Sequence, residues 1–171
     1  MRSALVLTIS DGVAAGERQD DSGRALAERL SGLGFRVESA VVPDDEEQIA
    51  RTVAVAVDRH VLVLTTGGTG LGPRDRTPQT LHALLDYEIP GFGEQMRSAG
   101  RTSTPLADLS RSLAGVLDRT LVVAVPGSPR GALESLAAIE PLLDHALETL
   151  AGQTAHAAAD VPAADGTSAR G

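Results

Sequence analysis

Short apolar runs alternate with helical patterns along most of this chain, and that alternation limits the possible folds more than any other feature. The runs indicate buried strands at Ala4–Thr8, Val37–Val42, Val61–Leu64 and Leu121–Val125. Strands that are covered on both faces are continuously apolar, and the helices between them provide the crossovers that parallel strands require. The pattern therefore predicts an α/β fold with a mostly parallel sheet.

Two of the intervening segments carry clear signals of a helix start. The segment Ser22–Leu33 follows N-cap candidates at residues 20–22, places its leucines on one face, and ends at Gly34, a residue suited to a helix C-terminus. Asp44 and Asp45 open the next helix, whose first turn is acidic as the helix dipole favours. Both segments are expected to pack their apolar faces on the sheet.

The second half of the chain departs from strict alternation. Leu113–Leu117 and Thr120–Val125 are separated by only two residues, which cannot form a parallel crossover, so we expect an antiparallel hairpin. Ile89–Gly93 is expected to be irregular. The last helix is expected from residue 128 or 131 to Leu150, with Pro141 as a kink or a break.

Length and composition exclude several classes of protein. A chain of 171 residues suits one domain, which we place at 1–152, followed by an Ala-rich segment at 153–171 that is expected to be disordered. The absence of cysteine excludes disulfides, thiolate catalysis and cysteine-bound zinc. A net charge of −8 argues against nucleic-acid binding. With no signal peptide or apolar span long enough for a membrane, a cytoplasmic location is expected.

The strongest local signal is the glycine-rich segment that follows the third strand. Residues 67–75 contain four glycines and end in Arg74 and Asp75, with Arg76 next. Consecutive backbone amides in such a loop can cradle a phosphate or the edge of a pterin. No Lys-Ser/Thr pair follows the glycines, so the loop is not a Walker A motif. A purely structural turn is the alternative, but cations beside a carboxylate favour a binding site.

Three aspartates follow the first three strands. Asp11, Asp44 and Asp75 should meet at one edge, because the carboxyl ends of parallel strands lie together. Carboxylates and phosphate oxygens are the ligands that Mg²⁺ prefers. The alternatives are that Asp44 is simply a helix N-cap and that Asp11 forms a turn.

A third loop, Val125–Gly131, follows the last strand and opens the final helix. The free amides of a helix N-terminus, together with Arg130, favour an anion there. A capped turn without a ligand is the alternative for this segment taken alone.

Several separate motifs, in the same order along the chain, resemble those of one known family. They are Thr66–Gly70, Arg74-Asp75 with Thr77-Pro78, Glu88–Glu94, Ser110-Arg111 and Pro126–Pro129. From Leu5 to Gly152 the chain closely resembles the Mog/MoaB family of molybdenum-cofactor proteins. The resemblance implies a three-layer α/β/α fold, a homotrimer, and a stand-alone adenylyltransferase that joins molybdopterin to ATP in the presence of Mg²⁺ and releases pyrophosphate. A molybdenum-insertion protein would be a possible partner.

The resemblance also assigns roles to residues. Asp44 and Asp75 match the family's functional aspartates and are expected to hold Mg²⁺, while Arg74 or Arg130 offsets charge that develops on the phosphates. The expected contacts of pterin and nucleotide are Ser10, Asp11, Asp21, Ser22, Gly23, Gly67, Gly68, Thr69, Gly70, Ser110, Pro126, Gly127, Ser128 and Arg130.

Two positions depart from the family pattern. Gln79 stands where an acidic residue is usual, and Leu81 where threonine is frequent. Gln79 favours the alternative of a non-catalytic pterin-binding paralogue, and a trimeric protein that delivers the cofactor is a second alternative. Retention of both Asp44 and Asp75 favours the enzyme.

Overall fold

The computed structural model describes residues 1–152, so the predicted tail at 153–171 lies outside the described part of the chain. The strands are β1 (Ser3–Ile9), β2 (Arg36–Val42), β3 (Leu62–Thr66), β4 (Tyr87–Glu88), β5 (Leu113–Leu117) and β6 (Thr120–Val125). The helices are α1 (Asp11–Ala14), α2 (Asp21–Gly32), α3 (Glu46–Ala56), α4 (Thr77–Leu84), α5 (Pro90–Gly100) and α6 (Pro129–Leu150), with a 3₁₀ helix, η1, at Pro105–Leu109.

The six strands form one sheet in the order β2-β1-β3-β6-β5-β4. The first four strands in that order are parallel, whereas β5 pairs antiparallel with both β6 and β4. The predicted hairpin is therefore confirmed, with Leu117 opposite Thr120. At its turn Asp118 adopts a φ of 55°, a conformation that aspartate tolerates better than most residues.

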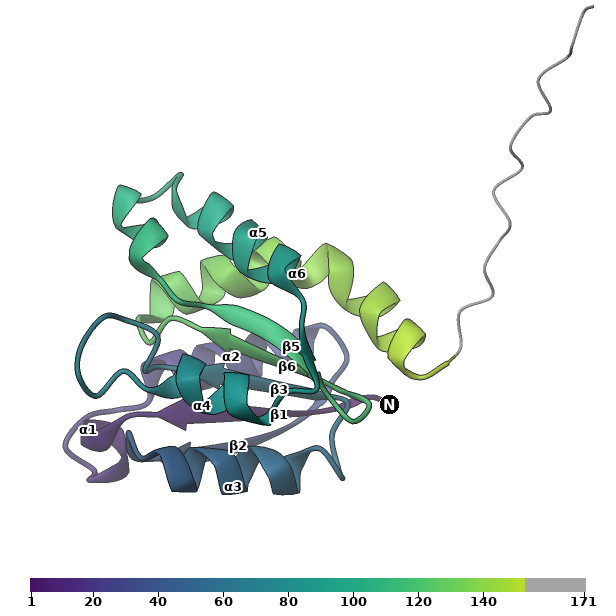
Figure 1. Ribbon diagram of the computed structural model, residues 1–171, viewed down its shortest axis with the longest axis horizontal. Helices are drawn as coiled ribbons and strands as arrows, with labels where there is room; N and C mark the ends of the chain where they lie inside the picture. Colours follow the sequence, from purple (N-terminus) through teal and green to yellow (C-terminus); the bar gives the residue numbers. More distant parts are fainter. Residues whose placement is uncertain (153–171) are drawn as a thin grey trace, which may run out of the picture.

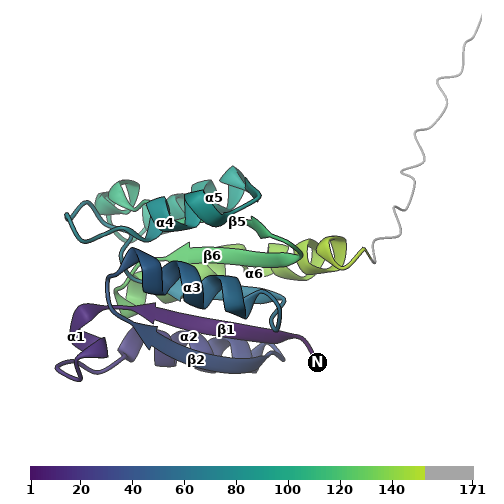
Figure 2. The ribbon, with the colours of Figure 1, turned by 60° about the horizontal axis from the view of Figure 1, so that its bottom comes forward.

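Helices cover both faces of the sheet and give the three layers seen in Figures 1 and 2. On one face, Leu26 and Leu30 of α2, Met96 of α5 and Leu136 of α6 pack against the strands. On the other face, α3 and α4 contribute a second core, which includes Ile49. Every residue of β3 and β6 is buried, as the continuous apolar runs predicted. The α/β/α fold is confirmed.

Helix ends explain where the structure differs from the predicted boundaries. Asp45, not Asp44, caps α3 by accepting a hydrogen bond from the Gln48 amide. The prediction that Ile89–Gly93 is irregular is wrong, since α5 begins at Pro90, whose fixed φ suits a first helical position. Of the kink or break predicted at Pro141, the break is wrong, because α6 runs through this residue without interruption.

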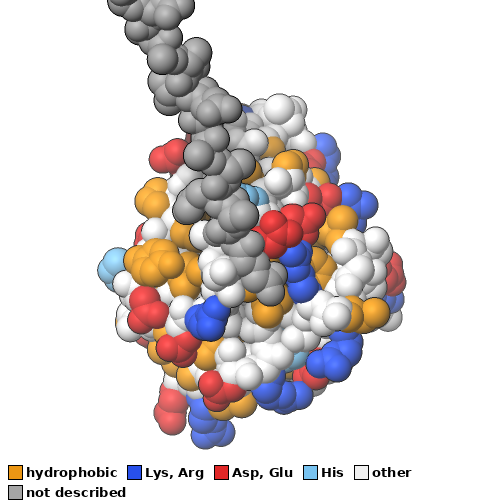
Figure 3. All heavy atoms as spheres, turned by 90° about the vertical axis from the view of Figure 1, so that its right-hand side faces the viewer, with side chains coloured by type: hydrophobic (Ala, Val, Ile, Leu, Met, Phe, Trp, Pro, Cys, Tyr) orange, Lys and Arg blue, Asp and Glu red, His pale blue; other side chains and the backbone are white. Residues whose placement is uncertain are grey.

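The loops that follow the parallel strands all lie at one end of the sheet, and this end carries the candidate functional site. Figure 3 looks onto the opposite end, where acidic and basic side chains are interspersed with apolar ones. Within residues 1–152, no helix is long and apolar enough to cross a membrane.

Candidate functional site

The glycine-rich loop and the loop before α6 are joined at the carboxyl edge of the sheet. The Thr66 hydroxyl donates to the Pro126 carbonyl at 2.8 Å, and the Gly67 amide donates to the Val125 carbonyl at 3.2 Å. A side chain at Gly127 would place its Cβ 3.2 Å from the Gly67 Cα. Glycine at position 127 therefore lets the two backbones approach closely without crowding.

Gly67 and Gly68 have positive φ angles of 106° and 64°. A Cβ on Gly67 would lie 2.2 Å from the Ile9 carbonyl oxygen, and a Cβ on Gly68 would lie 2.3 Å from the Thr77 hydroxyl. The Thr77 hydroxyl donates to the Gly67 carbonyl at 2.9 Å and fixes the turn from below. The loop thus presents main chain, rather than side chains, to the space above the sheet.

Asp11 and Asp44 hold each other through reciprocal hydrogen bonds. The Asp11 amide donates to the Asp44 carboxylate at 2.9 Å, and the Asp44 amide donates to the Asp11 carboxylate at 3.0 Å. Arg74 pairs with both oxygens of Asp11, at 2.7 and 2.9 Å, and reaches the Asp44 carbonyl at 3.2 Å. The hydrogen bond from Arg74, reinforced by the Asp44 amide, lowers the pKa of Asp11 below its ordinary value, so this carboxyl stays ionised.

Asp75 is oriented by its own loop. One carboxylate oxygen, Oδ2, accepts from the Gly72 amide at 2.7 Å, and the Asp75 amide donates to the Gly72 carbonyl at 3.0 Å. Among the described residues, Oδ1 of Asp75 and Oδ1 of Asp44 have no hydrogen-bond donor. Each aspartate therefore has one oxygen fixed by the protein and one available to a ligand.

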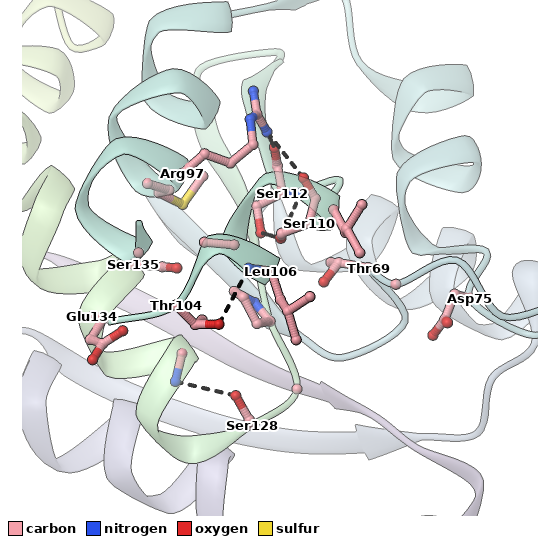
Figure 4. Close-up of a pocket in the computed structure, with 18 of the residues that line it drawn as sticks. Thr69, Asp75, Arg97, Thr104, Leu106, Ser110, Ser112, Ser128, Glu134 and Ser135 are labelled. Carbon is pink, nitrogen blue, oxygen red and sulfur yellow. Dashed lines mark hydrogen bonds between the residues drawn. The ribbon is translucent and has the colours of Figure 1, made fainter. Parts of the chain in front are cut away.

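Two cavities meet over these loops. The first, of about 550 Å³, lies beside α5 and is called the α5 cavity (Figure 4). The second, of about 710 Å³, lies between α1 and the start of α2 and is called the α2 cavity. Both are lined by Gly68, Asp75, Gly127 and Ser128, which form their shared wall.

The start of α6 gives this shared wall a positive character. The Ser128 hydroxyl caps the helix by accepting from the Gly131 amide at 3.2 Å. Unpaired amides in the first turn and the helix dipole favour a negatively charged ligand. The arrangement suits phosphate groups that lie where the cavities join.

The family model described as a probable molybdopterin binding domain matches residues 5–145, which is most of the chain. The chain belongs to the Mog/MoaB family. The MoaB enzyme of molybdopterin biosynthesis from Thermus thermophilus has 48% sequence identity and a TM-score of 0.83, covering 89% of this chain and 98% of that one.

Curated Mog/MoaB relatives carry functional names. The molybdopterin adenylyltransferase of Escherichia coli K12 is 39% identical over 145 residues, which are 82% of this chain and 74% of that protein. A bifunctional molybdenum cofactor biosynthesis protein from Synechococcus elongatus is 40% identical over 151 residues, 87% of this chain. The chain spans about half, 47%, of the length of that bifunctional protein.

Most of the residues that the Mog/MoaB resemblance assigned to the pocket line one of the two cavities. The α5 cavity includes Gly68, Thr69, Gly70, Asp75, Ser110, Pro126, Gly127 and Ser128. The α2 cavity includes Ser10, Asp21, Ser22, Asp44, Gly67, Gly68, Asp75, Gly127 and Ser128. The loops that the sequence pattern singled out therefore come together in space.

Four of the assigned residues are absent from the described lining of both cavities: Asp11, Gly23, Arg74 and Arg130. Asp11 and Arg74 pair with each other. Gly23 packs behind the wall, where a Cβ would lie 2.3 Å from the Thr8 hydroxyl. Arg130 is paired with Glu134 at 2.8 Å. Asp11 and Arg74 thus contact Asp44 from outside the cavities, whereas Gly23 and Arg130 lie outside both linings.

The sequence pattern missed the outer wall of the α5 cavity. Arg97 of α5 donates to the carbonyls of Ser110 and Ser112, and Thr104 caps η1. Figure 4 shows Arg97 and Glu134 far from Asp75 across this cavity. Leu106 of η1 also lines it. No motif marks these positions, although the segment Glu88–Glu94, part of the resemblance, leads into α5.

The two departures from the Mog/MoaB pattern lie outside the described lining of both cavities. Gln79 is exposed on α4 and borders a separate hollow. Leu81 is fully buried in the core formed with α3. Neither residue is among those that line both cavities with Asp75.

A site for Mg²⁺ was predicted from three gathered carboxylates. Within residues 1–152 no group of three His, Cys, Asp or Glu side chains is arranged to hold a metal ion. Asp11 pairs with Arg74 instead. The remaining pair, Asp44 and Asp75, lines the α2 cavity together. A pair of carboxylates fits Mg²⁺ when phosphate oxygens and water supply its other ligands.

Proposed function

We propose that this chain is a molybdopterin adenylyltransferase of molybdenum-cofactor biosynthesis. The observation that carries this function is the pair of cavities that share a wall containing Asp75. A reaction that joins two large anionic molecules needs two adjacent sites whose reacting groups meet. The shared wall, with its glycines and the start of α6, is where two phosphate groups would meet.

The reaction forms one P–O bond and breaks another. An oxygen of the molybdopterin phosphate attacks the α-phosphorus of ATP, and the bond from that phosphorus to the bridging oxygen of pyrophosphate breaks. A phosphate anion is already a nucleophile, so the protein's main contribution is to position the two groups in line and to offset their charge. Gly68 and Ser128, the N-cap of α6, line this region.

Asp44 and Asp75 would hold Mg²⁺ through the oxygens that make no hydrogen bond within the described protein. When bound, the metal would neutralise charge on the phosphate oxygens and favour pyrophosphate as a leaving group. The Gly72 amide keeps the Asp75 carboxylate oriented, and the Asp11 amide does the same for Asp44. Both ligands are thus pre-arranged by main-chain donors.

Arg74 supports the site through Asp11 and the Asp44 carbonyl rather than by lying in a cavity. Arg130 is similarly committed to Glu134. For either side chain to offset charge on a phosphate, as the sequence suggested, it would have to exchange its present partner for the substrate. A supporting role for Arg74 needs no such exchange and is the one we propose.

The same proposal includes a homotrimer in the cytoplasm that passes its product to a molybdenum-insertion protein. The trimer and the partner rest on the family resemblance alone. Analytical ultracentrifugation of the purified chain tests the trimer, and a sedimentation coefficient of a monomer would reject it.

The function is tested by incubating the purified protein with molybdopterin, Mg²⁺ and ATP and following adenylyl-molybdopterin and pyrophosphate. The Asp75→Asn variant should lose turnover while keeping its melting temperature, because the amide side chain preserves shape but is a poorer metal ligand. Asp58→Asn, in the exposed turn that follows α3, is the matched control and should keep full activity.

Product from the wild type and from Asp58→Asn, but not from Asp75→Asn, would support both the enzyme and the role of Asp75. Equal rates in all three proteins would remove Asp75 from the mechanism. Tight binding of molybdopterin without any product in the wild type would reject the enzyme and favour the pterin-binding or delivery alternative.

A further inference from the structure

The loop at residues 69–75 carries Asp75 and contains no helix or strand. It lies between β3 and α4, and its tip is open to solvent: Leu71 is 68% exposed. Within the loop, hydrogen bonds join Gly72 to Asp75. The position of the Asp75 carboxylate over the shared wall therefore depends on what anchors this loop from outside.

Arg111, which precedes β5, binds the loop at both ends. Its amide donates to the Thr69 carbonyl at 3.0 Å. Its side chain donates from Nε to the Gly70 carbonyl at 2.9 Å and from Nη2 to the Asp75 carbonyl at 2.5 Å. One residue at the edge of the sheet thus connects the first residues of the loop to the residue that carries the carboxylate.

Other contacts that hold this loop to the rest of the protein are exposed ion pairs, which are weaker. Arg74 and Arg76 form pairs with Asp11 and Glu46, and each of these side chains is substantially exposed. Exposed ion pairs contribute little because water screens them and long side chains lose freedom when they pair. The Arg111 contacts are partly buried and end on main-chain carbonyls, so they restrain the backbone itself.

We propose that Arg111 is a positioning residue for Asp75. Its planar guanidinium presents two N–H donors along one edge, and this fork spans the carbonyls of Gly70 and Asp75 together. A lysine at this position keeps the charge but offers a single donor centre. The two-donor geometry of the guanidinium, rather than its charge, holds the two ends of the loop together.

Arg111 acts through Asp75 and not on the substrates. It borders a separate hollow of about 490 Å³ together with Gln79 and Glu94. It is not among the described residues that line the α5 or the α2 cavity. The consequence of this role for catalysis rests on the proposed function, whereas its consequence for loop order does not.

The test compares Arg111→Gln and Arg111→Lys with wild type. Arg119→Gln is the matched control, because Arg119 also donates to a carbonyl, that of Leu150, but far from the loop. Hydrogen–deuterium exchange is followed in peptides that cover residues 69–76. The Gly72 and Asp75 amides should exchange at least roughly 10-fold faster in both Arg111 variants, because local opening becomes easier. Peptides from β1 and β3 should be unchanged.

The catalytic readout separates positioning from folding. In both Arg111 variants kcat should fall roughly 10- to 100-fold, the size expected when a catalytic group is misplaced by about 1 Å. The KM for molybdopterin and the melting temperature should stay near their wild-type values, as should all properties of Arg119→Gln.

Wild-type exchange in Arg111→Gln would overturn the proposal. So would recovery of both exchange and kcat in Arg111→Lys, since the charge alone would then suffice. If Arg111→Gln does not fold, exchange of the loop amides and kcat in Arg111→Lys test the proposal instead. An inactive wild type would reject the proposed function, and the exchange data would still decide the role of Arg111.

Discussion

Replacing Gly67 by alanine should destabilise the protein through two separable effects. The backbone at Gly67 has a φ of 106°, and an added Cβ would lie 2.2 Å from the Ile9 carbonyl oxygen. Holding a residue other than glycine at such a φ costs about 1–3 kcal/mol. Displacing packed main chain to relieve the overlap costs about 1–3 kcal/mol more. Together the unfolding free energy should fall by about 2–6 kcal/mol, a large part of the total of about 5–15 kcal/mol.

Gly34→Ala isolates the first effect. Gly34 has a φ of 87°, and a Cβ there would meet no atom within 4 Å. This variant should therefore lose only the first contribution, about 1–3 kcal/mol. Urea denaturation followed by circular dichroism measures the unfolding free energy of the wild type and of both variants. The slope of this free energy against urea concentration should be the same in all three proteins. The reasoning is refuted if Gly67→Ala is destabilised no more than Gly34→Ala.

Three further predictions concern the core, the support of the loop and pH. Leu136→Ala, which empties a fully buried position, should lower the unfolding free energy by about 2–5 kcal/mol in the same assay. Thr77→Val should cost about 1–3 kcal/mol because it leaves the Gly67 carbonyl without its donor, whereas Thr102→Val on the surface should cost less. Burial lowers the pKa of His60 below 6.5, so the unfolded chain binds its proton more readily and the unfolding free energy should fall as the pH drops below about 6.5. Denaturation at several pH values should show a smaller fall between about pH 7.5 and 5.5 in His60→Asn than in the wild type.

Periodicity was sufficient to predict the sheet because its strands are buried on both faces. Val61–Leu64 and Leu121–Val125 were predicted nearly as they occur in β3 and β6. The two-residue gap after Leu117 likewise determined an antiparallel pair. These features are local, and a single chain carries them without help from tertiary contacts.

The predictions of local structure were wrong where tertiary packing, or the position of a residue within a helix, determines the conformation. The sequence suggested an irregular segment at Ile89–Gly93 and a kink or a break at Pro141. Instead, Pro90 starts α5, and α6 continues through Pro141, which lies on its exposed side. Pro141 lacks one helical hydrogen bond, but the buried leucines that flank it hold both halves on the sheet. Burial of the helix face therefore outweighs the local preference of proline.

The candidate site was predictable in its loops but not in its contacts. Strand order brings Asp11, Asp44 and Asp75 to one edge, as expected for parallel strands. The pairing of Asp11 with Arg74 depends on side-chain positions that no spacing reveals. The walls supplied by α5 and η1 were missed because they carry apolar and small residues, such as Leu106, without any chemical signature.

The shared wall has a consequence for the release of the product. A product that contains both halves would fill the α5 and α2 cavities at once, so release requires both halves to leave together. Two tethered halves rebind at a high effective concentration, and the joined molecule dissociates more slowly than either half. Under the proposed function, the wall that brings the two substrates together would therefore also delay the departure of their product.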